Sequence, residues 1–458
     1  MAPIEAGTGE IEGRLAAHMS AAGSVPLSEE VSAKTKAHVL DSVAAMISGA
    51  ALPAGRQAHR YIAQFGADGR AAIAMTNRRV RAIDAAFANA MAAHADETDD
   101  SHLEGRFHPG CGIVSTALAL AESKNLGGAS LLRSVALGYD IGARFTLALG
   151  MTSPRSWTHS THCLGANFGA TATAGALCQL SPDQCRWLLA YGVQQASGLP
   201  IWHRDVDHVQ KAFDFGAMAA RNAVFAAEFV ASGATGVTDA IAGEHGYLKG
   251  FAQAPNPAAL VDGLGETQGI LSASIKKWCV GSPIQAALDA LEVLMSEHGV
   301  RADNVARLDV TLPDDRIKIV DNRDMPDICV QHCLAALLLD GSLPFESAHD
   351  KSRMSAPDVL ALRKKIRAIP SRELTVARPA RQAIVEIETT HGERVRHHTR
   401  AVSGTPDKPM TWDDVAAKAT DLVAPVLGQK RAQALIETIG ALDASIRVER
   451  IGALMQSN

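Results

Sequence analysis

Aromatic residues are scarce in this sequence, with 11 Phe, 5 Trp and 4 Tyr among 458 residues. A large core is still possible because 47% of the residues are hydrophobic. That core must be mainly aliphatic, which favours close-packed helices. An excess of charge is also missing, since 44 basic and 49 acidic side chains leave a net charge of −5. The balance gives no electrostatic reason to bind nucleic acid or an anionic membrane.

Long apolar runs are absent as well. No segment offers about 18 uninterrupted apolar residues, the length that a membrane-spanning helix needs. The first 20 residues carry acids early and lack a basic patch followed by an apolar stretch, which argues against a signal peptide. We therefore expect a soluble protein of the cytoplasm.

Cysteines are few and scattered, which excludes two further classes of protein. Their odd number does not suit a disulfide framework, and no CxxC pair supports an iron–sulfur or structural zinc site. Dinucleotide-binding, P-loop, zinc-protease and nucleophile-elbow patterns are also missing. We therefore predict neither a bound metal nor another cofactor. The seven cysteines are Cys111, Cys163, Cys178, Cys185, Cys279, Cys329 and Cys333.

The hydrophobic pattern is helical from about residue 27 to 243 and changes near residue 272. Segments 305–313 and 372–379 have a strand-like composition, and 382–400 alternates like a hairpin with His391-Gly392 at its turn. Helical patterns return from Thr411. We therefore predict a mainly α fold, in which a large all-helical domain (1–270 plus 403–458) carries a smaller inserted α+β domain (271–402).

The densest polar cluster is His94-Ala95-Asp96-Glu97-Thr98-Asp99-Asp100-Ser101-His102, directly after an apolar helical stretch. Neighbouring carboxylates repel one another, so one of them can be poised as a base near neutral pH. A solvated acidic loop with helix caps would give the same pattern, and acidic clusters also bind Mg²⁺. The nearby His and Lys residues favour proton chemistry on an anionic substrate.

A second segment, His108-Pro109-Gly110, precedes the helical stretch 111–122. Pro and Gly before a helix leave its first N–H groups pointing outward, where a substrate carboxylate can bind. An ordinary turn at a helix start would have the same sequence. Its closeness to the acidic cluster supports the functional interpretation of both.

Three further segments carry candidate groups. The loop 157–165 contains His159 and His162 before a Gly/Ala-rich helical stretch, and a His there can act as an acid or base. Lys211 opens another small-residue helix, and the pair Lys276-Lys277 precedes Ser282 where the two domains join. These cations can bind an anion. Alternatively, the His side chains are structural and the Lys side chains are solvated surface charges.

In this order the segments resemble the MmgE/PrpD family, which includes 2-methylcitrate dehydratase, cis-aconitate decarboxylase and iminodisuccinate epimerase. The resemblance covers nearly the whole chain. It implies a two-domain, mostly helical subunit with a smaller α+β lid domain, a homodimer, and cofactor-free chemistry on small di- or tricarboxylates. The segments that carry it are HADETDDSHLEGRFHPGCGIVSTALALAE (94–122), GYDIGARF (138–145), KAFDFGAMAARNA (211–223) and CVQHCLAALLLDG (329–341).

The resemblance also implies which residues form the site. The run of Asp99, Asp100 and Ser101 matches the family's Asp-Asp-Thr run, and Glu97 stands where the family usually has Asp. In the loop, His159 is the better match to the family's His, and His162 could take its place after a shift. Where the family often has a His after the lid-junction Lys, this chain has Ser282 in a shorter segment. The implied catalytic residues are Glu97, Asp99, Asp100, His108 and His159, and the substrate-binding residues are Ser101, His102, His162, Lys211, Lys276, Lys277 and Ser282.

The family's reactions share one step, the removal of a proton from a carbon next to a carboxylate, with cations or N–H groups holding the developing charge. We expect dehydration of a hydroxylated di- or tricarboxylate. Epimerisation or isomerisation is the second hypothesis and decarboxylation the third. A hypothesis of another class is a non-catalytic helical dimer that binds a carboxylate ligand. Unused charges in a cleft cost desolvation energy, which argues against this last hypothesis.

Overall fold

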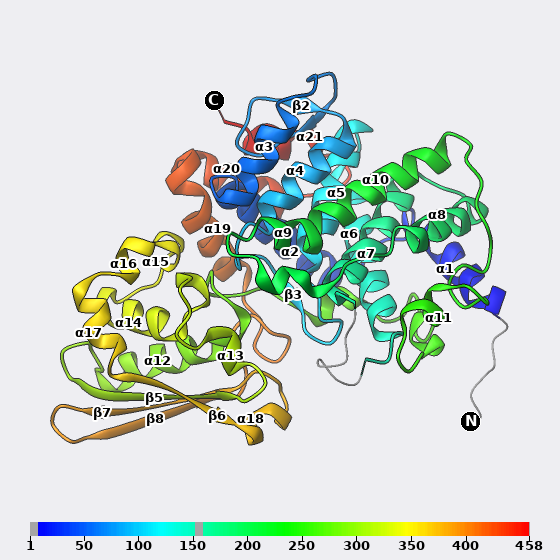
Figure 1. The fold of residues 1–458 in the computed structure, drawn as a ribbon. Helices are drawn as coiled ribbons and strands as arrows, with labels where there is room; N and C mark the ends of the chain where they lie inside the picture. The colour runs from blue at the N-terminus through cyan, green and yellow to red at the C-terminus, as the bar shows by residue number, and fades with distance from the viewer. Residues whose placement is uncertain (1–7, 152–158, 458) are drawn as a thin grey trace. The chain divides into compact units, whose positions relative to one another are not determined.

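The computed structural model describes residues 8–151 and 159–457, and the chain folds into two units (Figure 1). The helical unit comprises residues 1–95, 99–273 and 422–458, and the sheet unit comprises residues 96–98 and 274–421. Part of the segment used to argue against a signal peptide, and the first two residues of the loop 157–165, lie outside the described residues.

The helical unit is built around α5, α6 and α7, which pack against one another. Their many Ala and Gly residues let the backbones approach closely: a Cβ on Gly138 would lie 2.9 Å from the carbonyl oxygen of Gly169. The α-helices that lie wholly in this unit are α1 (Thr8–Ala22), α2 (Glu29–Gly49), α3 (Pro53–Ile62), α4 (Ala82–Ala93), α5 (Pro109–Ser123), α6 (Gly128–Leu147), α7 (Thr161–Leu177), α8 (Pro182–Gln194), α9 (Val209–Ala212), α10 (Met218–Ala231), α11 (Tyr247–Phe251), α20 (Gln429–Gly440) and α21 (Glu449–Met455).

Short elements complete the helical unit, and they correct the expectation that it would be all-helical. β1 (Ala71–Ala72) and β2 (Arg79–Val80) form an antiparallel ladder, and β3 (Ser101–His102) is a further short strand. Each strand has only two residues, so the unit is still mainly α. The 3₁₀ turns are η2 (Pro200–Arg204), η4 (Pro257–Leu260) and η5 (Gly269–Ser272), and η3 (Phe213–Ala217) is a π-helical turn between α9 and α10.

The sheet unit contains a four-stranded sheet in the order β6-β5-β7-β8. β5 (Val305–Pro313) pairs in parallel with β6 (Ile366–Ser371) and antiparallel with β7 (Ala383–Thr389), which pairs antiparallel with β8 (Arg394–Thr399). α12 (Gln285–His298) packs on β7 and β8, and α14 (Val330–Asp340) packs on α12 and β6 (Figure 1). Shorter helices are η6 (Ser282–Ile284), α13 (Ile317–Val320), η7 (Pro326–Ile328), α15 (Phe345–His349), α16 (Lys351–Met354), α17 (Pro357–Arg363) and α18 (Arg372–Val376).

The strand predicted at 305–313 and the hairpin predicted within 382–400 are confirmed. Gly392 adopts the left-handed conformation, with φ +84°, in the hairpin turn. The strand predicted at 372–379 is wrong, because 372–376 form the helix α18. The side chain of Ser371 accepts a hydrogen bond from the backbone N–H of Leu374 and so caps that helix. The parallel strand is the preceding segment, β6.

The boundaries of the units differ from those expected from the sequence. Residues 96–98 and 403–421 belong to the sheet unit, and β4 (Ala273–Ser274) and α19 (Trp412–Leu427) both cross a boundary. Hydrogen bonds within the sheet unit explain this: the Lys418 ammonium donates to the carbonyl oxygen of Thr98, and the Ser403 N–H donates to Asp289. The role of this unit as a lid stays a prediction.

No single helix among residues 8–151 and 159–457 is long and apolar enough to cross a bilayer. The pair α2 and α3 passes that test together, by length and composition, but the two helices are bent by 81° relative to one another.

Candidate active site

The polar cluster at 94–102 is buried rather than a solvated loop. It begins where α4 ends at Ala93, and the side chains of Asp99 and Asp100 have no exposed surface. Buried carboxylates require charged or hydrogen-bonding partners, because leaving them unpaired costs several kcal/mol. Each carboxylate of the cluster has partners of its own, and those partners assign it a distinct chemical character.

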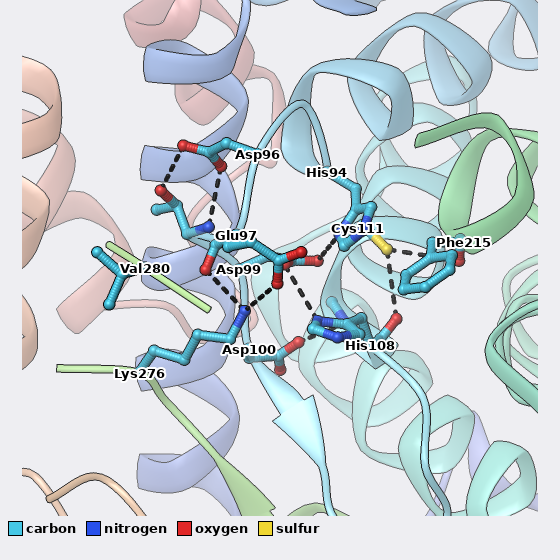
Figure 2. Close-up of polar contacts among 12 residues, drawn as sticks. His94, Asp96, Glu97, Asp99, Asp100, His108, Cys111, Phe215, Lys276 and Val280 are labelled. Carbon is cyan, nitrogen blue, oxygen red and sulfur yellow. Dashed lines mark hydrogen bonds and ion pairs between the residues drawn. The ribbon is translucent and has the colours of Figure 1, made fainter. Parts of the chain in front are cut away.

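In the helical unit, Asp99 is held by two imidazoles (Figure 2). Its two carboxylate oxygens lie 2.8 Å from His94 Nδ1 and 3.1 Å from His108 Nδ1. Burial alone would raise the pKa of Asp99, but the nearby His94 and His108 lower it by more, so it ends well below the usual range. Asp99 is therefore ionised at neutral pH and fixes the ring of His108, the residue that precedes α5.

Asp100 is bound by three donors within the helical unit. The Tyr139 hydroxyl donates to it at 2.5 Å, His38 Nδ1 lies at 2.6 Å, and the backbone N–H of Gly110 donates at 2.8 Å. The last contact caps the N-terminus of α5, the site that the sequence proposed for a substrate carboxylate. Burial and the carboxylate of Asp100 raise the pKa of Tyr139 well above its ordinary value, so the phenol stays protonated. Asp100 thus positions α5 from inside the protein.

The loop His that lies beside His108 is His162, not His159. The His162 ring stacks on Phe215, with centroids 3.9 Å apart and planes inclined by 8°, and its centroid is 5.4 Å from that of His108. The His159 ring packs against Phe251 instead, with a centroid distance of 4.6 Å. The sequence favoured His159 and kept His162 as the alternative, and the geometry favours that alternative.

Lys211, like His162, lies near the Phe215 ring of the helical unit. Its ammonium nitrogen is 5.2 Å from the centroid of Phe215 and 5.6 Å from that of Trp202. Both distances are within the range of a cation–π interaction. Lys211 and His162 therefore both contact the Phe215 ring.

In the sheet unit, residues 96–98 are bound by three cations. The ammonium of Lys276 donates to the Glu97 carbonyl oxygen at 2.7 Å and lies 3.5 Å from its carboxylate, as Figure 2 shows. The Asp96 carboxylate pairs with His349 Nε2 at 2.8 Å. The third cation is Lys418, bonded to Thr98. Burial lowers the pKa of His349, but Asp96 and other neighbours raise it by more, to about 9.

The other predicted residues of this unit are Lys277 and Ser282. The Lys277 ammonium pairs with Glu292 on α12 at 2.5 Å and lies over the Trp278 ring, and its side chain is 31% exposed. Ser282 is half-buried at the start of η6. The two neighbouring Lys residues thus have different partners: Lys276 binds Glu97, and Lys277 pairs with Glu292.

Ser101 and His102 form β3 in the helical unit and are buried. His102 Nδ1 accepts a hydrogen bond from the backbone N–H of Gly105. Burial lowers the pKa of His102 to about 4, so its ring is neutral at physiological pH. This geometry suits a structural role for His102.

Three residues of metal-binding type meet in the helical unit. Ligand atoms of His94, Asp99 and Cys111 all lie within 4.8 Å of one another. The Cys111 thiol donates to the carbonyl oxygens of His108 and Phe215 at 3.3 and 3.6 Å, and burial together with Asp99 raises its pKa well above 9. Two of these residues, His94 and Asp99, also belong to the acid–base cluster around His108. The absence of a bound metal stays a prediction.

Sequence reasoning missed the residues that hold the predicted ones in place. Tyr139, Asp214 and Phe215 lie in segments that carry the family resemblance, but sequence reasoning assigned them no role of their own. For His38 in α2, the possible signal was a buried polar residue in an apolar helical pattern. The missed residues are His38, Tyr139, Trp202, Asp214, Phe215, His349 and Lys418.

Two family models match this chain. The MmgE/PrpD N-terminal domain matches residues 13–259, and the MmgE/PrpD C-terminal domain matches residues 278–444. The chain belongs to the MmgE/PrpD family. The cis-aconitate decarboxylase-like protein oryM of Aspergillus oryzae is 25% identical over an alignment of 464 positions, which covers 93% of each chain. The resemblance seen in the sequence is confirmed, and the family supports an enzyme of the lyase type.

Proposed function

We infer that the protein is a lyase that removes a proton from a carbon next to a carboxylate and expels water from a small hydroxylated di- or tricarboxylate. The observation that carries the inference is the pairing of ionised Asp99 with His108 in the helical unit. An ionised Asp that binds Nδ1 of a His fixes its tautomer and leaves Nε2 to move a proton. His108 is the proposed proton-transfer group, and Asp99 positions it.

The cations supply the second requirement of this chemistry. Abstraction next to a carboxylate builds negative charge on that carboxylate, and a preorganised cation lowers the cost of this charge. Lys211 and Lys276 are the proposed carboxylate-binding residues, with Lys276 held beside Glu97. Glu97 and His162 are further proposed acid–base groups, since each lies next to a residue already assigned to the site.

The proposed reaction balances without a redox partner. A base takes the proton from the carbon next to the carboxylate, and the C–H electron pair forms the C=C bond. The C–O bond breaks at the adjacent carbon, and an acid protonates the departing hydroxyl to give water. Acid–base side chains and cations are sufficient for every step.

Decarboxylation is the second candidate, and the decarboxylase-like relative favours it. In that reaction the C–C bond to one carboxylate breaks, carbon dioxide leaves, and an acid of the site protonates the carbon that keeps the electron pair. Both reactions need a cation at a retained carboxylate and a positioned proton donor. They differ in the group that leaves.

A panel of hydroxylated and unsaturated di- and tricarboxylates tests the proposal. We expect a dehydratase to form an unsaturated acid, seen by ultraviolet absorbance, and to exchange the abstracted hydrogen in D₂O, seen by NMR. Released carbon dioxide would establish decarboxylation instead, and exchange with inversion but no elimination would establish an epimerase. Binding without turnover of any member would favour the non-catalytic carboxylate-binding protein.

Removal of metals adds a second arm to the same test. We expect prolonged treatment with EDTA to leave turnover intact, because the proposed steps use side chains alone. Loss of turnover that only a divalent cation restores would contradict this account. A homodimer in the cytoplasm, with neither nucleic acid nor membrane as partner, stays a prediction from the sequence.

A further inference from the structure

Asp214 is a buried carboxylate that the proposed reaction does not use. It lies in the π-helical turn η3, three residues after Lys211 and directly before Phe215, and is 6% exposed. Single π-helical turns are rare and are often found at functional sites. Its neighbours in the helical unit show a specific arrangement.

Two hydrogen bonds join Asp214 to Trp202 through Ser160. The Ser160 hydroxyl donates to Asp214 Oδ2 at 2.6 Å and accepts from the indole N–H of Trp202 at 3.3 Å. The direction of this relay is fixed, because an indole N–H can only donate and an ionised carboxylate can only accept. The Ser160 hydroxyl must therefore donate its hydrogen bond to Asp214.

The relay joins the segments that carry the two stacked rings of the site. Ser160 immediately precedes α7 and is two residues before His162, while Asp214 is next to Phe215. Trp202 meets both rings edge-on, at 5.6 Å from His162 and 4.8 Å from Phe215. Fixing Ser160 and Asp214 to one another thus fixes how His162 lies on Phe215.

The backbone around Asp214 leaves its carboxylate little room to rotate. Gly198 has φ +110°, and its carbonyl oxygen accepts a hydrogen bond from the Ser160 N–H at 2.9 Å. A Cβ on Gly198 would lie 2.9 Å from Asp214 Oδ1 and 2.6 Å from the Cβ of Cys163. The second carboxylate oxygen is therefore packed against backbone, and Gly is required at position 198 by both space and conformation.

We propose that Asp214, acting through Ser160, is a positioning residue that holds the His162 ring and the Trp202 indole in the proton-transfer site. Its effect on catalysis rests on the proposed function, whereas its effect on Trp202 does not. Asp214 is not itself assigned a contact with substrate.

The ionisation of Asp214 provides the means to test this role. Burial raises the pKa of Asp214 to about 7, against the opposing effect of the Ser160 hydrogen bond. Titratable groups on the elements packed around η3 include Cys163 and His162 of α7, His203 of η2, Lys211 of α9 and Cys111 of α5, and His94 and His108 lie against the neighbouring Phe215 ring. Below about pH 7 the carboxyl gains a proton, no longer accepts fully from Ser160, and the relay weakens.

Substitutions at the two ends of one hydrogen bond separate positioning from general stability. Asp214→Asn keeps a neutral acceptor oxygen and cannot titrate, so its kcat should stay near the level that the wild type reaches below about pH 7, and the change of kcat across pH 7 should be lost. Asp214→Leu and Ser160→Ala each break the relay, and each should lower kcat roughly ten- to hundredfold, with a smaller change in KM. The double variant, which combines Asp214→Leu with Ser160→Ala, should be no slower than the slower of the two single variants, because both substitutions remove the same interaction.

The indole ¹H–¹⁵N resonance of Trp202, assigned from the variant Trp202→Phe, reports on the relay without any substrate. It should shift with a midpoint near pH 7 in the wild type and lose that step in Asp214→Asn and Ser160→Ala. Glu122→Gln is the control, since burial also raises the pKa of Glu122 to about 7 at a place where Arg79 and the N–H of Ala72 hold it. This variant should keep the Trp202 step.

Three outcomes would overturn the proposal: a Trp202 resonance that does not titrate in the wild type, the same step in Asp214→Asn, or additive rate losses in the double variant. A titrating Trp202 in a protein that turns over no member of the carboxylate panel would support the relay and overturn the proposed function.

Discussion

At the scale of single residues, neighbouring carboxylates differ because their partners differ. Asp99 accepts from two imidazoles and stays ionised, whereas Asp100 is bound by a phenol, an imidazole and a backbone N–H. Glu97 is paired with a buried ammonium in the other unit of the chain. Pairing each acid separately removes most of the mutual repulsion that a run of acids would otherwise suffer.

The two loop His residues give the first prediction. His162→Ala should lower kcat by roughly 10²–10⁴, the usual effect of removing an acid–base group, because its ring lies beside His108. His159→Ala is the matched control and should stay within a few-fold of the wild type, because its ring packs on Phe251. Steady-state kinetics on the substrate found in the panel measure both. A large loss of kcat for His159→Ala alone would contradict the assignment of His162 and would identify His159 as the acid–base group.

The adjacent Lys residues give the second prediction. Lys276→Met should raise KM and lower kcat together, by roughly tenfold or more in kcat/KM, because it removes a cation proposed to bind the substrate carboxylate and to bind it more strongly as charge builds up in the transition state. Lys277→Met should change neither by more than a few-fold, since Lys277 pairs with Glu292 at a half-exposed position. Thermal melting of each variant checks that the fold is kept. Equal effects of the two substitutions would contradict the assignment of Lys276.

At the scale of elements, the start of α5 is where packing and chemistry meet. His108 immediately precedes the helix, Pro109 begins it, and the N–H of Gly110 is bound by Asp100. This N-terminus is occupied by a protein carboxylate, so it anchors α5. The sequence pattern for an anion site was therefore informative, although the anion belongs to the chain itself.

Glycine substitutions along α5 give the third prediction. A Cβ on Gly110 would lie 2.2 Å from Ser42 Oγ and 2.9 Å from Asp100 Oδ1, so Gly110→Ala should destabilise the protein by about 1–3 kcal/mol through overpacking. It should also lower turnover, because it displaces Asp100 next to the Asp99–His108 pair. In Gly112→Ala the nearest atom, Ala166 Cβ, is 3.3 Å away, so the loss should be smaller. Urea denaturation compares the two, and a larger loss for Gly112→Ala would contradict the anchor at Gly110.

At the scale of the whole molecule, buried charge pairs make stability depend on pH. His349 has its pKa raised to about 9 in the folded protein, whereas an unfolded His titrates near 6.5. Because the pKa of His349 is higher in the folded protein, protonated His349 stabilises the fold. This contribution is fully present below the pKa of the unfolded chain and is lost as pH rises through about 9. Asp99 acts in the opposite direction, since its lowered pKa stabilises the protein above the unfolded value of about 3.9 and is lost in acid.

The fourth prediction concerns the alkaline limb of this dependence. Between about pH 6.5 and pH 9 the wild type should lose about 3 kcal/mol of unfolding free energy that a His349→Gln variant does not lose. His298→Gln, an exposed position at the end of α12, is the control and should follow the wild type. Urea denaturation at each pH measures the difference. Parallel curves for wild type and His349→Gln would show that His349 is not charged in the folded protein.

How far the sequence predicts the structure differs between elements. Helices and alternating strands were predicted because hydrophobic periodicity is local, and the hairpin with Gly392 at its turn is confirmed. The segment 372–379 was misread because its β-branched residues favour a strand, whereas the Ser371 cap makes 372–376 helical. The end of the inserted unit was misplaced because a bond such as Lys418 to Thr98 joins residues 320 positions apart.

By itself the sequence determined the mainly α fold, the MmgE/PrpD family and the polar segments that contain the candidate site. Composition, spacing and short motifs carry this information, since each depends on residues near one another in the chain. Only the tertiary structure decided that His162 rather than His159 lies beside His108, that Asp100 anchors α5, and that Ser160 joins Asp214 to Trp202. Such choices depend on which distant side chain fills the remaining hydrogen-bonding position of a buried group, and spacing along the chain does not specify that partner.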